Sequence, residues 1–247
     1  MHYNGPSPQK ANQARIMDTK IKLSSNPDFN PFASEEVPPA HSEEWTAKRR
    51  IAKALRELSS QLITSAEDSP ELIAFAESVE AVIEARPDFP RLEGILAFAE
   101  TGKFGGWGEL SHEINALGGQ ANPLSPEFSI WFVDGRAFGK TRFGWLYEGP
   151  PGHVHGGYVA AIFDQFMGMA QIIGGNPGRT GHLNTRYHSP TPLNVDLRLY
   201  GDIIKQEGRK TVITATLYAG ETLTASSEAL FITPRDGHIL PMSGGGH

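Results

Sequence analysis

The sequence predicts an α+β fold, in which an antiparallel sheet packs against one buried helix and a helical extension precedes the sheet. Three observations predict it. After about residue 122, runs rich in Thr, Val, Ile and aromatic residues follow one another, separated by turn residues. One apolar run, roughly residues 158–173, lies between the second and third of these runs. Before residue 90, apolar residues recur at helical spacing instead.

Residues 1–41 are rich in Pro, Asn and Ser and lack periodicity, which predicts a flexible or surface-draped arm. A helical extension and linker should follow over 42–121. The first helix is expected at about 43–65, with an apolar set of Ile51, Leu55, Leu58 and Leu62. In "DSPEL", Ser69 can cap a second helix that begins at Pro70. Its apolar set is Leu72, Phe75, Val79 and Val82, so the two helices are expected to form a hairpin.

The stretch "TGKFGGWG", residues 101–108, reads as a break. A β-hairpin follows, because "FSIWFV" and "RAFGKTRFG" flank the tight-turn pair "DG". Four further strands are expected in "GHLNTRYHS", "NVDLRLYGDII", "RKTVITATLYAG" and "ETLTASSEALFIT". The helix over 158–173 has few polar positions, so the sheet should wrap around it. The main domain is therefore expected over 122–236, with a flexible tail over 237–247.

Composition excludes several classes of function. The 247-residue chain has a net charge of -6, which argues against broad attraction to nucleic acid. It contains no cysteine, so disulfides, thiolate metal sites and cysteine nucleophiles are excluded. No signal peptide and no run of about 18 apolar residues is present, so we expect no membrane span and a cytoplasmic location.

The stretch "EGPPGHVHGGYVAAIFDQFMG" combines a glycine turn, a helix and a single acid, Asp164. The N–H groups of Gly156 and Gly157 are expected to lie unpaired at the positive end of the helix. Such groups can hold an oxyanion that develops on a carbonyl. The turn is therefore a candidate electrophile-binding site, and Asp164 a candidate base.

Asp164 follows Gly156 by eight residues, which places it on the order of 9–12 Å along the helix. One carbonyl cannot easily contact both. Two copies with antiparallel helices would bring Asp164 of one near the glycine turn of the other. The spacing thus favours a homo-oligomer with shared sites.

Each part of the motif also has an ordinary interpretation. A lone helix acid is commonly structural, and "HGG" is commonly just a turn. His153 and His155 alternate without a carboxylate or cysteine partner, so we expect no metal site. His182 and His188 are read as surface or strand residues.

Together, "NPLSP", "YEGPPGHVHGGYVAAIFDQFMG", "TGHLNTRYHSPTPL" and "GRKTVITATLYAGETLTASSEALFI" resemble the PaaI-like acyl-CoA thioesterases of the hotdog fold. They resemble especially the subgroup that includes the human thioesterase superfamily members four and five. The resemblance covers about residues 122–234. Its spacing is specific, because an acid follows the turn histidine by nine residues and a threonine follows the acid by sixteen.

The resemblance implies roles position by position. Asp164 matches the general base or nucleophile, Gly156 the backbone oxyanion donor, His155 a residue that shapes the turn, and Thr180 the hydroxyl beside the acid. Some relatives carry an upstream Asn or Gln that binds the thioester oxygen. The corresponding "YEGPPGHV" has none, which leaves Glu148 or His153 to replace it.

The expected substrate is an acyl-CoA, so coenzyme A belongs to the substrate and no cofactor is expected. Gly157 would support the oxyanion site. Phe163 and Met167 are candidates for the acyl site, or ordinary core. Basic residues on the strands would bind the phosphates of coenzyme A, and the candidates are Arg186, Lys205 and Arg209. Each of them could equally be an ordinary solvated charge.

The predicted activity is hydrolysis of acyl-CoA to free acid and coenzyme A by a homodimer or a dimer of dimers (homotetramer), within lipid metabolism. One alternative is a non-catalytic acyl-CoA-binding hotdog module. The hydratase branch of the fold is disfavoured because the helix carries no Asp–His pair. A serine hydrolase is disfavoured because no G-x-S-x-G elbow is present.

Overall fold

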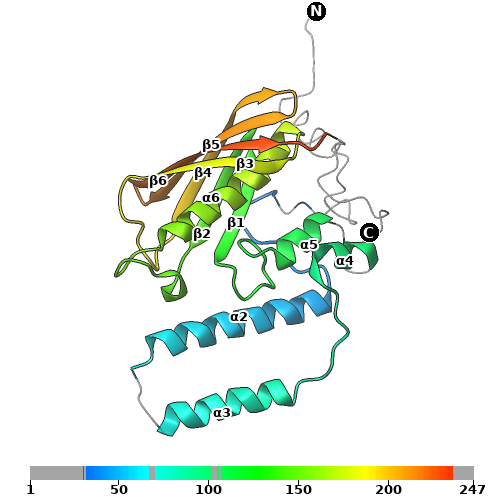
Figure 1. The fold of residues 1–247 in the computed structure, drawn as a ribbon, viewed down its shortest axis with the longest axis vertical. Coiled ribbons are helices and arrows are strands. Elements are labelled where there is room, and N and C mark those ends of the chain that lie inside the picture. The colour runs from blue at the N-terminus through cyan, green and yellow to red at the C-terminus, as the bar shows by residue number, and fades with distance from the viewer. Residues whose placement is uncertain (1–29, 31, 67–69, 102–104, 106, 236–247) are drawn as a thin grey trace, which may run out of the picture.

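The structure is a computed structural model that describes residues 30, 32–66, 70–101, 105 and 107–235 (Figure 1). Residues 1–29 of the predicted arm, the predicted cap Ser69 and the predicted tail 237–247 lie outside the described residues. In the part of the chain that is described, no helix is both long and apolar enough to cross a membrane.

The sheet has six antiparallel strands in the order β1-β2-β4-β5-β6-β3. All six predicted strands are confirmed: β1 Glu127–Val133, β2 Arg136–Arg142, β3 Arg179–Tyr187, β4 Leu197–Glu207, β5 Lys210–Ala219 and β6 Thr222–Ile232. Asp134 and Gly135 join β1 to β2 with φ of 50° and 79°, as a tight hairpin turn requires. Strand β3 comes third in sequence but lies at the sheet edge beside the last strand.

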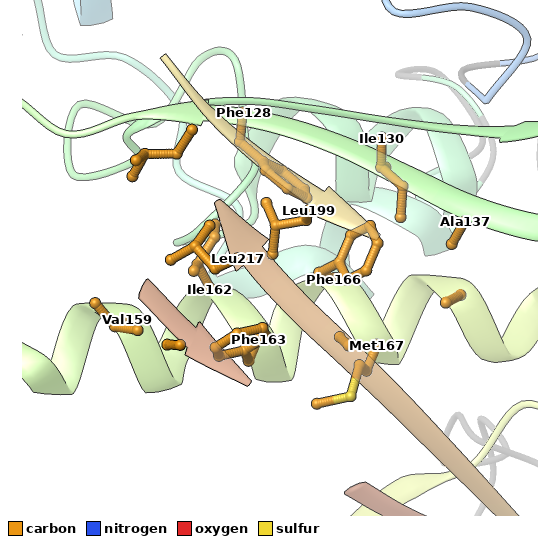
Figure 2. Close-up of a cluster of buried hydrophobic side chains, with 14 of the residues drawn as sticks. Phe128, Ile130, Ala137, Val159, Ile162, Phe163, Phe166, Met167, Leu199 and Leu217 are labelled. Carbon is orange, nitrogen blue, oxygen red and sulfur yellow. The ribbon is translucent and has the colours of Figure 1, made fainter. Parts of the chain in front are cut away.

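The predicted central helix is α6, Gly156–Ala170, and a 3₁₀ turn, η2 Gln171–Gly174, extends it. It begins two residues earlier than predicted, directly after the turn histidine. The helix lies across one face of the sheet (Figure 1). Its fully buried side chains include Ile162, Phe163 and Phe166, which pack toward Leu199 and Leu217 of the sheet (Figure 2).

Glycines in the sheet let α6 lie close to it. A Cβ added to Gly201 would come within 2.7 Å of the Phe166 ring, and one on Gly139 within 3.0 Å. A side chain at Gly201 would therefore force the ring to shift, and one at Gly139 would make an unusually tight contact with it. The packing fixes where the outward face of α6, which carries Asp164, is presented.

Within the described residues, four helices precede the sheet: α2 Glu43–Thr64, α3 Pro70–Glu84, α4 Gly94–Thr101 and α5 Trp107–Ile114. The first two confirm the prediction, and α3 begins at Pro70 as expected. Helices α4 and α5 were not predicted from the sequence, and α5 begins inside the stretch interpreted as a break. A 3₁₀ turn, η1 Trp145–Tyr147, follows β2.

The face by which α2 contacts the rest of the chain is not its most apolar one. Trp45 and Ala52 are buried, and Arg49 donates to both carboxylate oxygens of Glu113 on α5 at 2.6 and 2.9 Å. Ile51, from the predicted apolar set, is 60% exposed. The helix was therefore predicted correctly and its buried face wrongly, because Arg49, paired with Glu113, takes an inward position. Helix α3 buries no residue.

The described part of the predicted arm lies against the sheet. Phe32 is buried and stacks on Phe132 of β1 with ring centroids 4.8 Å apart. Glu35 pairs with Lys140 at 3.5 Å and with Arg198 at 2.8 Å. Of the two interpretations of the arm, this stretch follows the surface-draped one, and it packs on the domain that was expected to begin at residue 122.

Candidate active site

Asp164 and Thr180 lie in contact where α6 meets the edge strand. Thr180 Oγ1 donates a hydrogen bond to Asp164 Oδ1 at 2.7 Å. Asp164 is half-buried on the outward face of α6, whereas Thr180 is exposed. A shift of the β3–β6 register lies between Thr180 and His182. Such irregularities re-aim side chains, and here the strand presents a hydroxyl to the carboxylate.

Gln171 holds the start of β3 against the end of α6. Its Nε2 donates to the Gly178 carbonyl at 3.0 Å, and its Oε1 accepts the Gly178 N–H at 2.6 Å. The side chain is buried, and Nε2 also donates to the Gly168 carbonyl. Because Thr180 follows two residues later, this buried amide helps to set the distance between Thr180 and Asp164.

The loop before α6 is shaped by its own side chains. Glu148 Oε1 accepts the Gly152 N–H at 2.6 Å. His153 Nδ1 lies 2.8 Å from the Pro151 carbonyl, an arrangement in which this nitrogen carries the proton. The two residues considered as replacements for the missing upstream amide are thus engaged within the loop.

His155 caps the helix. Its Nδ1 accepts the Gly157 N–H at 3.0 Å, so the expectation that this N–H is unpaired is wrong. The residue N-terminal to a helix commonly supplies such an acceptor, which here is an imidazole nitrogen. For the Gly156 N–H, the described part of the chain offers no acceptor. Of the two glycines, Gly156 therefore retains an available donor at the positive end of α6.

The glycine turn also forms one wall of an open cavity of about 400 Å³. Tyr187 and His188, at the end of β3, line the same cavity. Tyr187 Oη donates to the Gly156 carbonyl at 2.8 Å. His188 Nε2 lies 2.8 Å from Ser226 Oγ. The sequence alone indicates these two residues only as part of a strand or its surface.

Asp164 and Gly156 lie on one regular helix, eight residues apart. At about 1.5 Å per residue, their positions differ by roughly 12 Å along the axis. A single carbonyl carbon, which must lie about 3 Å from its attacking oxygen, cannot be served by both within one chain.

The remaining predicted residues are placed as follows. Phe163 and Met167 have no exposed surface and pack in the hydrophobic core (Figure 2), and their contact with an acyl chain stays a prediction. Lys205 pairs with Glu207 at 3.1 Å, and Arg209 donates to the Thr233 carbonyl at 2.8 Å.

The three selected cations do not form one cluster in a single chain. Arg186 lies opposite Ser226 on β6. Arg209 precedes Lys210, whose partner on β6 is Ile232, six residues along that strand from Ser226. At about 3.3 Å per strand residue, the two ends are roughly 20 Å apart. Across the described ranges, no group of three or more His, Asp or Glu residues is arranged to hold a metal ion.

Comparison with known proteins links this site to one family. The sequence profile of the thioesterase superfamily matches residues 151–226, which contain the turn, α6 and β3. A solved structure of a thioesterase superfamily protein is 30% identical, covers 79% of this chain and 97% of its own length, and superposes with a TM-score of 0.63. Because residues 122–236 are only about half of this chain, that match extends into the preceding helices.

Curated relatives carry the name acyl-coenzyme A thioesterase THEM4. The Mus musculus protein is 33% identical over 113 residues, which are 44% of this chain and 49% of the relative. The Rattus norvegicus protein is 37% identical over 87 residues, which are 34% and 37% of the two chains. The chain thus spans half or less of the length of these curated relatives.

Proposed function

Since the chain belongs to the thioesterase superfamily and has its hotdog fold, we propose that it hydrolyses acyl-CoA thioesters to a free acid and coenzyme A. The observation that carries the proposal is the carboxylate of Asp164, which accepts a hydrogen bond from Thr180 at 2.7 Å and lies on the same helix that begins with the available N–H of Gly156. The coenzyme A part rests on the names of the curated relatives, which match only over part of their length.

In the proposed reaction, Asp164 removes a proton from a water molecule, whose oxygen attacks the thioester carbonyl carbon. The carbonyl oxygen becomes an oxyanion that accepts a hydrogen bond from the Gly156 N–H. Collapse of the tetrahedral intermediate breaks the C–S bond and releases the thiolate of coenzyme A. The proton on Asp164 then passes to the thiolate or to solvent, which restores the carboxylate.

Asp164 could instead attack the carbonyl directly and form an acyl anhydride that water cleaves. Both routes require the same carboxylate and the same oxyanion donor. Water labelled with ¹⁸O distinguishes them under single-turnover conditions. Direct attack by water puts the label in the product acid alone. In the anhydride route, attack of water on the Asp164 carbonyl puts the label in Asp164 and leaves one of its own oxygens in the product, so labelled Asp164 would identify this route.

The proposal includes a homodimer. Because Asp164 and Gly156 are roughly 12 Å apart along α6, each site would combine Asp164 and Thr180 of one copy with Gly156 of the other. In this arrangement, Gly157 supports the turn through its bond to His155. Arg186 of one copy and Lys205 or Arg209 of the other could then meet the phosphates of one coenzyme A.

A free-thiol release assay over short, long and aryl acyl-CoAs tests the activity. Wild type should release thiol from at least one class, and Asp164→Asn should slow this release by at least about 100-fold, the typical contribution of a general base. Asp202→Asn is the matched control, since it removes a carboxylate from an exposed ion pair with Arg136. Binding of all three classes without thiol release would instead identify a non-catalytic acyl-CoA-binding module.

A further inference from the structure

We propose that Tyr187 is a positioning residue for the oxyanion donor, and that it acts in the active site whose base belongs to the partner copy. This inference rests on the proposed thioesterase function. Its starting point is the hydrogen bond from Tyr187 Oη to the Gly156 carbonyl at 2.8 Å, which spans 31 residues of sequence.

The peptide unit between Gly156 and Gly157 is held at both ends. Its carbonyl accepts from Tyr187 Oη at 2.8 Å, and its N–H donates to His155 Nδ1 at 3.0 Å. A peptide unit is planar, so two such bonds fix the orientation of the whole unit. The oxyanion donor, the Gly156 N–H, belongs to the neighbouring peptide unit.

Only the two backbone dihedrals of Gly156 separate the fixed unit from the donor. Glycine has the broadest dihedral freedom of any residue, so an unrestrained Gly156 would let the N–H direction vary. With the following peptide unit held by Tyr187 and His155, this freedom is reduced. The hydroxyl of Tyr187 therefore contributes to aiming the N–H at a developing oxyanion without touching the substrate carbonyl itself.

Tyr187 is placed for this role rather than for stabilising the core. Its side chain is 53% exposed, and its ring lies directly against Gly156, where an added Cβ would sit 3.4 Å from Cζ and Oη. Removing only the hydroxyl leaves the ring contact in place. An effect on the orientation of the Gly156 N–H can therefore be separated experimentally from an effect on folding.

Strand β3 links the two half-sites of one chain. Thr180 lies at its start and contacts Asp164, whereas Tyr187 is its last residue and contacts Gly156. If Gly156 serves the Asp164 of the partner copy, then Tyr187 serves that partner as well. One edge strand would then hold the base of one active site and the oxyanion donor of the other.

The first experiment compares Tyr187→Phe with wild type in the thiol-release assay. Because an oxyanion forms only in the transition state, kcat should fall about tenfold while KM stays within a factor of two. The unfolding midpoint should not change. Tyr200→Phe is the matched control, since it removes a tyrosine hydroxyl that has no hydrogen-bond partner in the described part of the chain. An unchanged kcat in Tyr187→Phe would overturn the inference.

The second experiment uses mixed dimers that carry two affinity tags. A dimer of one Asp164→Asn chain and one Tyr187→Phe chain has one site with both groups intact, so it should show about half the wild-type kcat. A dimer of one wild-type chain and one doubly substituted chain has no intact site, so its kcat should be at most about one-twentieth of the wild-type kcat. If the first dimer instead shows only the mean of its two parental homodimers, Tyr187 acts in its own chain's site and the inference is wrong.

The outcomes separate the two proposals. Full thiol release by Asp164→Asn, or none by wild type, would refute the proposed function. A strong loss in Asp164→Asn together with full activity in Tyr187→Phe would refute only the role of Tyr187.

Discussion

Thr180 Oγ1 donates to Asp164 Oδ1 at 2.7 Å, and this bond joins the edge strand β3 to the outward face of α6. The second carboxylate oxygen, Oδ2, has no hydrogen-bond partner in the described ranges. One oxygen is thus oriented by the protein while the other can accept a hydrogen bond from water. This is the arrangement that a general base requires, with the carboxylate fixed in direction but still able to take a proton.

Thr180→Val should lower kcat by roughly tenfold, because it removes the hydrogen bond to a charged group but keeps the branched shape of the side chain. Steady-state thiol release measures the effect. Thr180→Ser is the control, since it retains the hydroxyl and should stay within about threefold of wild type. A valine variant as active as wild type would show that the bond is structural only.

Gly156→Ala should fold normally and lose most of its activity. The added Cβ would meet Tyr187 at 3.4 Å, an ordinary contact, and Gly156 has no positive φ. A methyl group next to the donor N–H would nevertheless obstruct the oxyanion, so kcat/KM should fall by about 100-fold or more. Gly144→Ala, where the nearest atom is 3.8 Å away, should change neither activity nor the unfolding midpoint. Equal activity of both alanine variants would exclude Gly156 as the donor.

His155→Ala should destabilise the start of α6 by about 1 kcal/mol, because the Gly157 N–H loses its cap. The turn would also become less fixed, so kcat should fall more than stability alone explains. His155→Asn can supply another side-chain acceptor and should recover most of both properties. Chemical denaturation and thiol release on the same samples test this. If asparagine recovers nothing, the imidazole has a role other than capping.

The sheet and α6 were predictable because their signals are local. Alternation in "FSIWFV", the "DG" turn and the apolar run after "HGG" each report on residues close in sequence. The pairing of β3 with β6 at the edge depends on contacts between distant residues, and no local pattern indicates it. The same applies to Tyr187, which resembles any exposed strand aromatic until its contact with Gly156 is seen.

The inward face of α2 shows a second limit. Periodicity favoured Ile51 and Leu55, yet the structure turns Arg49 inward, where Glu113 neutralises it. A hydrophobic pattern cannot anticipate that a half-buried arginine pairs with a buried glutamate 64 residues away. The missed helices α4 and α5 have eight residues each, too few to display a persistent periodic face.

Arg49→Met should lower the free energy of unfolding by about 3 kcal/mol, because it removes the guanidinium that donates to both carboxylate oxygens of the buried Glu113. The double variant Arg49→Met/Glu113→Leu should recover much of that loss, since it removes both charges together. Urea denaturation of the two single variants and the double variant gives the coupling free energy. Additive losses would mean that the two side chains contribute independently and that the contact does not hold α2 on α5.

His112 on α5 predicts acid sensitivity of the extension. Burial, and secondarily the positive charge of Arg49, lower the pKa of His112 from 6.5 to about 4. The unfolded chain therefore binds a proton more readily than the folded one, so this residue's contribution to stability is complete above pH 6.5 and is lost as the pH falls toward 4. Between pH 7.5 and pH 5 the loss should be about 2 kcal/mol. His112→Gln, which does not titrate, should lose correspondingly less over this interval, as denaturation at both values would measure. Parallel losses in wild type and variant would show that other groups govern the acid sensitivity.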